Sequence, residues 1–585
     1  MLKKIIIKIY KLIFKYTPQE KFDLEENQNY QKWIENNEPD DEELEEQRHT
    51  KFNNMPKISI IVPMYNTPQK YFYELLDSVK NQTYLNWELC LADGSPEKAE
   101  YIDNLIIPLG EKVKYKLLDH NKGISGNSNE ALKLATGDYI ALLDHDDIIP
   151  KFALYEIVKA INKNPEAEFI YTDEDKILEE QDIRISPHFK QDFAIDTLRS
   201  YNYICHFSIL KKELMNKLKG FDSEFDGSQD YDLILRAIEE AKQIVHIPKI
   251  LYNWRINANS VASGASAKPY AYVAAKKAIL AHIERSGIHG AKVEDSRIMG
   301  LYKITYPVQG NPKISIIILN KDHKKDLKRC INSILKSTYD NYEIIIVENN
   351  STKKSIFRYY EKIKSDKIKI ETCNLKQFNY SKLNNFGASK ATGEYFVFLN
   401  NDTKIITRNW LETIIGNCKR KEIGAIGAKL IYKNKRIQHA GIVLNLTGTA
   451  GHVNLNEKEK KPGYMGRIMI QQNVSAVTGA LLGISRNTFE QIKGFDENFP
   501  IAYNDVDLCL KILETGKLIT YNPYIEAYHF ESRTRGYEDT EEKKERLSKE
   551  EKKLKDKWGK YFKTTDKYFS PNFRNDVPNM RVKFK

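Results

Sequence analysis

The sequence predicts an α/β protein with two tandem domains, each built on a Rossmann-like, mainly parallel sheet, and an N-terminal amphipathic helix. Residues 56–62 (PKISIIV) recur as 312–318 (PKISIII), and residues 135–139 (ATGDY) recur as 391–395 (ATGEY). Both spacings are 256 residues (312 − 56 and 391 − 135). Two separated segments that share one spacing indicate a duplicated domain. At 585 residues the chain has room for two such domains, each large enough to bury a core.

Residues 1–16 (MLKKIIIKIYKLIFKY) predict the amphipathic helix. Lys4, Lys8, Lys11 and Lys15 fall on one helical face, and isoleucine, leucine and tyrosine side chains fall on the other. Such a helix suits the surface of a membrane, but it is too short and too charged to span one. We expect peripheral attachment to the membrane, with docking onto the protein itself as the alternative.

Composition narrows the cellular setting and the partners. The six cysteines are scattered singly, which is typical of a reducing cytosol, so we expect a cytoplasmic protein on the inner face of the membrane. The net charge of +11 is segregated along the chain rather than patched, and we therefore expect no nucleic acid partner. The domain boundaries follow the repeats and the charge pattern. We expect an acidic linker over 17–55, the first domain over 56–300, the second over 311–540, and a basic helix and tail over 541–585.

Each repeat opens with a short β-branched run, at 58–62 and at 314–319, which predicts a buried parallel strand. A helix is expected next (71–81 and 326–336), then a second strand (87–92 and 342–347) that ends in acidic and small residues. Strand, helix and strand in this order form the nucleotide-binding half of a Rossmann-like sheet, although no Gly-rich fingerprint or P-loop is present.

A further apolar strand in each repeat runs directly into acidic residues. Residues 139–143 lead into Asp144 and Asp146, and residues 395–399 lead into Asn400 and Asp402. Oxygen ligands at the end of a buried strand suit a hard cation beside a bound diphosphate. A lone D-x-D is a weak signal, but its recurrence at the same spacing favours a divalent metal site, for Mn²⁺ or Mg²⁺, in both repeats.

At these motifs the chain resembles the inverting family 2 glycosyltransferases of GT-A fold, over roughly residues 56 to 575. It is more narrowly similar to the tandem enzymes that build bacterial O-antigen, rhamnose-rich or capsular polysaccharide. The stretches that carry the resemblance are 62–66 (VPMYN), 93–95 (DGS), 171–176 (YTDEDK), 226–232 (DGSQDYD), 251–255 (LYNWR), 477–480 (VTGA), 504–508 (NDVDL) and 529–536 (HFESRTRG).

The resemblance implies a set of site residues. The general bases would be Asp230 and Asp505, each followed two residues later by a second acid, Asp232 and Asp507, which we interpret as helix N-terminal charges. The implied metal ligands are Asp144, Asp146, Asp402 and His529. The implied nucleotide-sugar-binding residues are Pro63, Tyr65, Asp93, Asn129, Asp144, Glu348, Asn349, Asn385 and Asn400.

The two repeats differ at these positions. The second repeat places Asn349 where the first has Asp93, with Glu348 beside it, and the first repeat places Asn253 where the second has His529. An insertion of roughly twenty residues, expected within 439–467, precedes Asp505 and favours a mobile lid or acceptor loop, or a surface ornament.

The function expected from these residues is a bifunctional inverting glycosyltransferase. It would move sugars from nucleoside-diphosphate-sugar donors to a growing, lipid-linked bacterial surface polysaccharide, with a divalent metal and an Asp general base in each domain. The alternative is one catalytic domain beside a non-catalytic sugar- or nucleotide-binding domain. A carboxylate-pair glycoside hydrolase is disfavoured, because the acids follow nucleotide-type strands.

Overall fold

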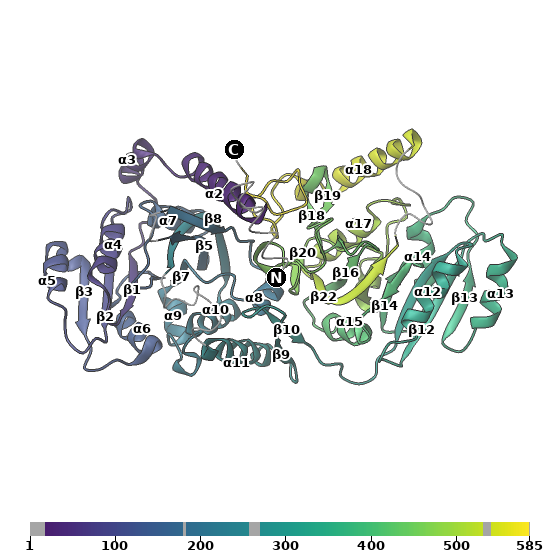
Figure 1. The fold of residues 1–585 in the computed structure, drawn as a ribbon, viewed down its shortest axis with the longest axis horizontal. Helices are drawn as coiled ribbons and strands as arrows, with labels where there is room; N and C mark the ends of the chain where they lie inside the picture. The colour runs from purple at the N-terminus through teal and green to yellow at the C-terminus, as the bar shows by residue number, and fades with distance from the viewer. Residues whose placement is uncertain (1–17, 179–182, 257–268, 531–539, 584–585) are drawn as a thin grey trace, which may run out of the picture.

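The computed structural model describes residues 18–178, 183–256, 269–530 and 540–583, so the predicted helix over 1–16 and residues 531–536 of the last motif lie outside it. Figure 1 shows two α/β domains side by side, joined below by α11 and the β9–β10 hairpin. The predicted fold class is confirmed: two large sheets are present, one in each half of the chain.

The first sheet has the order β3-β2-β1-β4-β7-β5-β6, and β8 pairs with β5. Strands β3, β2, β1 and β4 are parallel, whereas β7 runs antiparallel to β4 and β5. The strands are β1 (Ile58–Met64), β2 (Trp87–Asp93), β3 (Val113–Leu117), β4 (Tyr139–Leu142), β5 (Ala167–Leu178), β6 (Ile183–His188), β7 (Ser208–Lys211) and β8 (Gln243–Ile256).

Helices cover both faces of this sheet. The buried side chains of α4 and α7 pack on one face, and those of α6, α9, α10 and α11 pack on the other. The helices are α4 (Gln69–Lys80), α5 (Tyr101–Ile106), α6 (Gly123–Leu134), α7 (Ala153–Lys163), α8 (Ile195–Ser200), α9 (Lys212–Leu218), α10 (Gln229–Glu240) and α11 (Pro269–Arg285), followed by the hairpin of β9 (Lys292–Asp295) and β10 (Tyr302–Thr305).

The second sheet repeats this plan, with the order β13-β12-β11-β14-β21-β16-β22-β15. Its strands are β11 (Ile314–Asn320), β12 (Tyr342–Glu348), β13 (Ile368–Thr372), β14 (Tyr395–Leu399), β15 (Thr403–Ile405), β16 (Ile423–Ile431), β17 (Ile437–His439), β20 (Gln472–Val474), β21 (Leu481–Ser485) and β22 (Leu518–His529), and β18 (Ile442–Leu444) pairs with β19 (Ala450–His452) apart from it. Its helices are α12 (Lys324–Ile334), α13 (Lys354–Ile363), α14 (Tyr380–Lys390), α15 (Trp410–Cys418), α16 (Arg486–Gln491), α17 (Asn504–Leu513) and α18 (Glu541–Phe562).

The clearest sequence repeats lie at the amino ends of the central strands β1 and β11 of the two sheets. The Glu88 carboxylate accepts hydrogen bonds from the Ser59 hydroxyl at 2.6 Å and from the Thr136 backbone N–H at 2.5 Å. A Cβ on Gly137 would lie 2.5 Å from the Lys57 carbonyl oxygen, so the position needs glycine. The second domain repeats every contact with Lys313, Ser315, Glu343, Thr392 and Gly393. These repeats therefore serve folding, at the edge opposite the carboxyl ends of the strands.

The spacing between the repeats is not constant. The buried positions of α4 are Phe72, Leu75, Leu76 and Val79, and those of α12 are Leu327, Cys330, Ile331 and Ile334, at a spacing of 255 (327 − 72). The spacing returns to 256 at β4 and β14, where Tyr139 and Tyr395 pair with Ile58 and Ile314. The second domain thus lacks one residue before α12 and regains it before β14.

The insertion in the second domain falls after β16. Phe169 and Ala425 are equivalent at a spacing of 256, but their partners on the neighbouring strands, Leu210 and Ile484, are 274 apart. Residues of the inserted region are buried together with helix α2 (Pro18–Asn37) and the C-terminal tail, which corrects the expectation of a mobile lid or surface ornament. This junction cluster comprises Tyr30, Trp33, Phe189, Ile250, Val443, Leu446, Val453, Phe569, Phe573, Met580 and Val582.

A buried ion pair also joins the two domains. Asp196 of α8 is fully buried and lies 2.6 Å from the guanidinium of Arg420, which follows α15. The Thr520 hydroxyl of β22 donates to the same carboxylate at 2.5 Å, and the Asp196 backbone N–H donates to Asn473 of β20 at 2.9 Å. The domains are therefore fixed to each other by hydrogen-bonded, desolvated groups.

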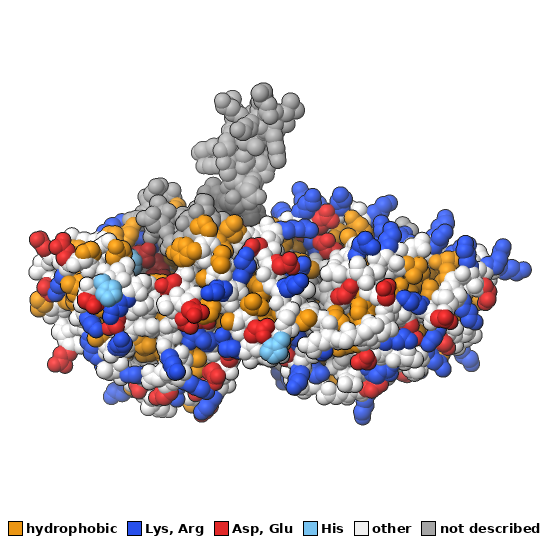
Figure 2. Space-filling model, turned by 90° about the horizontal axis from the view of Figure 1, so that it is seen from below, with side chains coloured by type: hydrophobic (Ala, Val, Ile, Leu, Met, Phe, Trp, Pro, Cys, Tyr) orange, Lys and Arg blue, Asp and Glu red, His pale blue; other side chains and the backbone are white. Residues whose placement is uncertain are grey.

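The region over 17–55, expected as an acidic linker, contains two helices, α2 (Pro18–Asn37) and α3 (Asp41–His49). Tyr30 of α2 donates a 2.5 Å hydrogen bond to Asp175 of β5, and Glu38 pairs with Arg184 of β6. Within the part of the chain that is described, no helix has the length and apolar character needed to cross a bilayer. The face seen from below carries basic and acidic side chains interspersed (Figure 2).

Candidate active sites

The carboxyl end of β4 brings three predicted site residues of the first domain together. Asp144 and Asp146 follow β4, and Asp230 lies in the first turn of α10. Desolvation raises the pKa of Asp144, the nearby ring of His206 opposes the rise, and the carboxylates of Asp146 and Asp230 add to it. The D-x-D and the predicted base therefore share one site.

Asp230 faces the segment that leads into β7. The Asn202 amide donates to Asp230 Oδ2 at 2.9 Å, and the Cys205 thiol lies 3.8 Å from the same oxygen. No donor from the described residues contacts Asp230 Oδ1, so this oxygen can accept a proton. The carboxylate is half-buried, at the N-terminal end of a helix.

Asp505 occupies the same place in the second domain. It lies in the first turn of α17, and its Oδ2 accepts a hydrogen bond from the Gly479 backbone N–H at 2.9 Å. Lys211 pairs with the first residue of β4, and Ser485 pairs with the first residue of β14. This register gives a spacing of 274 and makes Gly479 the counterpart of Cys205. The next residue, Ala480, accepts a hydrogen bond from the Asn400 backbone at 3.0 Å, so residues 479–480 connect the base to the D-x-D region.

Asp402 and His529 meet in the second domain, as the predicted metal set requires. His529 Nε2 lies 3.1 Å from Asp402 Oδ1, and its Nδ1 lies 2.8 Å from Gln438 Oε1 on β17. Since Gln438 offers an acceptor for an Nδ1–H, the tautomer that donates there would leave Nε2 free to bind a cation that Asp402 also holds. Two ligand atoms about 3 Å apart suit adjacent positions around a cation with bonds of about 2.1 Å.

The donor set therefore fits a divalent cation in the second domain, with Asp402, His529 and the Asn400 amide oxygen as ligands. Asn400 lies close by, with its Nδ2 at 3.3 Å from His529 Nε2. Among the described residues, no three His, Cys, Asp or Glu side chains are grouped closely enough to hold a metal by themselves. An amide, a diphosphate or water must complete the coordination.

Gln438 is a candidate positioning residue that the sequence did not reveal, and we expect Gln438→Met to weaken Mn²⁺ binding in the second domain. Removing the acceptor frees the His529 ring to rotate and to change tautomer, which typically costs 10 to 100-fold in metal affinity. Mn²⁺ titration followed by electron paramagnetic resonance would measure the change. Gln438→Glu, which keeps an acceptor oxygen, is the matched control. Unchanged affinity in Gln438→Met would show that Gln438 does not position the ring.

Asp93, the nucleotide-binding residue predicted at the end of β2, has a different counterpart in the second domain from the one predicted. Asp93 ends β2 and accepts hydrogen bonds from the Ser95 hydroxyl at 2.5 Å and from the Tyr115 hydroxyl at 2.9 Å. Glu348 ends β12 and accepts hydrogen bonds from the hydroxyls of Ser351 at 2.7 Å and of Tyr360 at 2.5 Å, the latter from helix α13 and not from the neighbouring strand. Glu348, and not Asn349, therefore stands in the place of Asp93, because the spacing here is 255 (348 − 93).

The other predicted nucleotide-binding residues have varied surroundings. Pro63 is buried within β1, whereas Tyr65 lies beyond the strand end and is 45% exposed. Asn349 is buried and accepts a hydrogen bond from the Leu375 backbone. Asn129 and Asn385 each clamp the backbone N–H and C=O of one residue, Phe221 or Phe495, in the Gly-Phe-Asp segments, at 2.9 to 3.0 Å. Their side-chain groups hold the loop that precedes each predicted base.

The predicted counterpart of His529 also shifts by one residue. Thr403 is opposite His529 on β22, and in the first domain Ile148 bridges Asn253 on β8. Antiparallel pairing then places Trp254, and not Asn253, in the position of His529. The Asn253 amide is committed elsewhere, donating to Asp175 at 2.6 Å.

His206 is a second residue that the sequence analysis missed. Its Nε2 lies 3.8 Å from Asp144 Oδ2, and its counterpart at a spacing of 274 is Ala480. Aligning the two domains at that spacing would have revealed His206, because an ionisable residue of the first domain then aligns with an alanine of the second, beside the carboxyl ends of the parallel strands.

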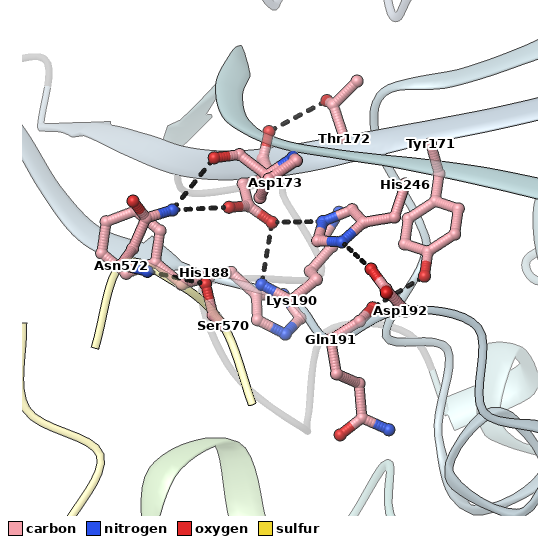
Figure 3. A network of polar contacts seen from close by, with 12 residues as sticks. Tyr171, Thr172, Asp173, His188, Lys190, Gln191, Asp192, His246, Ser570 and Asn572 are labelled. Atoms are coloured by element: carbon pink, nitrogen blue, oxygen red, sulfur yellow. Dashed lines mark hydrogen bonds and ion pairs between the residues drawn. The ribbon is translucent and has the colours of Figure 1, made fainter. Parts of the chain in front are cut away.

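Buried polar groups support the segment that carries His206, and Figure 3 shows the neighbouring contacts around Asp173. Lys190 is buried, and its Nζ donates to the carbonyls of Ile204 and His206 and to Glu174 at 3.2 Å. Glu174 also accepts from the His206 backbone N–H at 3.2 Å. Asp173, next in the chain, accepts from the Lys190 backbone N–H and contacts Asn572 of the C-terminal tail at 3.3 Å. The 171–176 motif therefore positions a loop of the site.

Asp232 and Asp507 are fully buried and are tied to structural partners. Asp232 pairs with Arg236 on the next turn of α10 at 2.7 Å. Asp507 accepts from the Trp558 indole of α18 at 2.8 Å and pairs with Lys557 at 2.7 Å. Both acids thus anchor their helices.

The chain matches known proteins in both halves. The model of Glycosyl transferase family 2 matches residues 59–219 and 315–493. An uncharacterised protein, y4gI, of Sinorhizobium fredii is 38% identical over 90% of this chain, and the O-antigen biosynthesis protein RfbC of Myxococcus xanthus is 31% identical over 86%. This chain spans 59% and 40% of the length of these two relatives.

A solved structure, S. aureus TarS 1-349 in complex with UDP-GlcNAc, is 21% identical over 39% of this chain and 66% of that chain, with a TM-score of 0.33. The family model covers most of each domain, from the first strand to the segment before the predicted base. The chain therefore belongs to Glycosyl transferase family 2, with one copy of the family domain in each half.

Proposed function

We propose that this chain is a bifunctional inverting glycosyltransferase that adds sugars from nucleoside-diphosphate-sugar donors to a growing bacterial surface polysaccharide. One observation carries the proposal. Asp230 and Asp505 lie at the same point of the two domains, each in the first turn of a helix and each facing the segment before the strand antiparallel to β4 or β14. Neither domain has lost the acid that the reaction needs.

Inverting transfer is a single displacement at the anomeric carbon. The acceptor hydroxyl must lose its proton as it attacks, and a half-buried carboxylate such as Asp230 can accept that proton. In the first domain, Asn202 engages one oxygen of this carboxylate and fixes its orientation, so that the other oxygen faces the acceptor. In the second domain the Gly479 N–H donates to Oδ2 of Asp505 and the Val506 backbone N–H donates to its Oδ1 at 2.9 Å, so both oxygens are oriented and the acceptor hydroxyl would meet a remaining lone pair of this carboxylate.

The departing diphosphate gains negative charge, and a bound divalent metal, Mn²⁺ or Mg²⁺, would supply stabilisation of that charge. Asp144 and Asp146 would hold it in the first domain, and Asp402 and His529 in the second. Asp93 and Glu348, buried at the ends of β2 and β12, are placed to contact the nucleoside.

RfbC, named for O-antigen biosynthesis, supports a polysaccharide acceptor, and the basic segment 1–16 supports a lipid-linked acceptor at the cytoplasmic face of the membrane. The second candidate is one catalytic domain with one donor- or glycan-binding domain. The amide at Asn400, where the first domain has Asp144, favours the second domain as the non-catalytic one.

A donor panel tests the proposal. We expect the purified chain to release nucleoside diphosphate from at least one sugar donor when Mn²⁺ or Mg²⁺ and an acceptor extract are present, and chelation to suppress the release. Nucleotide release would be measured for UDP-, GDP-, dTDP- and CDP-sugars separately. Absence of release from every donor, in a chain that binds the same nucleotides, would overturn transferase activity.

A further inference from the structure

The two domains each place one histidine against the D-x-D region, but from different strands. In the second domain the histidine is His529, at the end of β22, and the β7-type segment carries Ala480. In the first domain the β22-type position carries Trp254, and the histidine is His206, in the segment before β7. Each domain therefore has a histidine at a position where the other domain has a side chain that cannot bind a metal: His529 aligns with Trp254, and His206 aligns with Ala480.

The His206 ring is held in one orientation. It stacks on the Tyr252 ring, with centroids 4.5 Å apart and planes 9° apart, and it meets the Trp254 ring edge-on at 5.7 Å. The Tyr252 hydroxyl is itself fixed, donating to Asp147 at 2.6 Å. The backbone on both sides of the ring is held by Glu174 and Lys190, two buried side chains. A ring constrained on its face, its edge and its backbone has little freedom to turn away from Asp144.

His206 and Asp144 are too far apart for a direct hydrogen bond but close enough to share a cation after a small shift. His206 Nε2 and Asp144 Oδ2 are 3.8 Å apart, beyond hydrogen-bond range. Two adjacent ligands of an octahedral cation with bonds of about 2.1 Å lie about 3.0 Å apart. Shared binding would therefore bring the two atoms about 0.8 Å closer together. The side chain of His206 is also only 13% exposed, which keeps bulk water from one side of the site.

We infer that His206 is a metal-binding residue of the first domain, which replaces in function the histidine that β22 supplies in the second. Together with Asp144 it would give the first domain one nitrogen and one carboxylate ligand, and Asp146, a diphosphate or water would have to complete the coordination. The second domain would use one nitrogen, one carboxylate and the amide of Asn400. The inference rests on the proposed function only in requiring that the first domain hold a divalent metal.

Mn²⁺ alone is the probe, and electron paramagnetic resonance of the full chain is the readout, so no substrate or turnover is needed. The experiment uses a His529→Phe background, which removes the histidine of the second domain. We expect the bound Mn²⁺ in this background to show electron spin-echo modulation from an imidazole ¹⁴N, since His206 is intact. Adding His206→Phe, which keeps an aromatic ring against Tyr252, should remove that modulation and lower the affinity at least about tenfold.

His145→Phe in the same background is the matched control, because His145 lies within the D-x-D yet its Nδ1 is 3.2 Å from the Thr67 hydroxyl. It should leave the ¹⁴N modulation in place. The His529→Phe variant leaves the first domain unaltered, so bound Mn²⁺ without ¹⁴N modulation in this variant would overturn the inference. Modulation that persists after His206→Phe is added would also overturn it. A chain that binds Mn²⁺ through His206 but releases no nucleotide from any donor would overturn the proposed function alone.

Discussion

Asp230→Asn and Asp505→Asn are each expected to abolish one sugar transfer and leave the other intact. An amide cannot accept the proton of the attacking hydroxyl, and loss of a general base typically costs 10²- to 10⁴-fold in rate. The substitution keeps the shape of the side chain and its neighbours, Asn202 in the first domain and Gly479 in the second. Linkage analysis of the product made by each variant is the measurement that resolves the two activities.

Asp232→Asn and Asp507→Asn are the controls, because these acids lie two residues further along the same helices and bind Arg236, or Trp558 and Lys557. We expect both to lower the midpoint of unfolding while each transfer rate stays within about tenfold of the unmodified chain. If Asp505→Asn changes no linkage while Asp230→Asn removes all of them, the second domain is a binding module.

Arg420→Leu is expected to weaken the junction between the domains strongly. It leaves the Asp196 carboxylate buried, with Arg199 4.0 Å away as the nearest remaining cation of the described residues, and breaking one side of a buried pair costs about 3 to 5 kcal/mol. The matched control is Arg574→Leu, which breaks an exposed pair with Asp576 and should cost about 1 kcal/mol or less. Urea unfolding followed by tryptophan fluorescence would compare the variants.

The cost of Arg420→Leu should also depend on pH in a defined direction. In the intact chain, burial raises the pKa of Asp196, whereas Arg420 and Arg199 lower it. The net shift of this pKa is downward. The ionised form is therefore the stable one above the unfolded pKa of about 3.9, and its contribution is lost as pH falls through the lowered value. Without Arg420, burial dominates and the pKa rises, so acidification should narrow the difference between variant and parent. A difference that is constant from pH 7 to pH 4.5 would contradict a buried, ionised Asp196.

The sequence predicted the fold well because the evidence was local and repeated. The β-branched runs at 58–62 and 314–319 are buried strands, and the strand that leads into each D-x-D is present. The edge strands β3 and β13 were not predicted, since VKYKL and IKIET alternate Lys or Glu with apolar residues and are only half-buried. An edge strand has one neighbour and needs no continuous apolar run.

The candidate site was predicted less evenly. Asp144, Asp230, Asp402, Asp505 and His529 lie at the carboxyl edges, where motif order put them, although their roles stay predictions. The counterpart of Asp93 was misplaced by one residue, because the spacing of 256 was applied where the second domain lacks one residue. The counterpart of His529 was also misplaced by one residue, because Asn253 was chosen from its motif and only the antiparallel strand register identifies Trp254. Gln438 was missed because its contact with His529 joins strands far apart in the sequence, which no local pattern reveals. His206 was missed because the two repeats were not compared at the spacing of 274 that applies after the insertion.

The tail contact at Asn572 bears on how the chain is synthesised. Asp173 lies in the middle of the first domain, yet one of its hydrogen-bond partners, and much of the junction cluster beside it, comes from residues after 568. On a ribosome that adds roughly 5 to 20 residues per second, the first domain would wait about 15 to 60 s after its own last strand emerges. During that interval Asp173 and its neighbours are open to solvent and to chaperones, so the contacts of the first domain are completed only after residues 569–582 have been made.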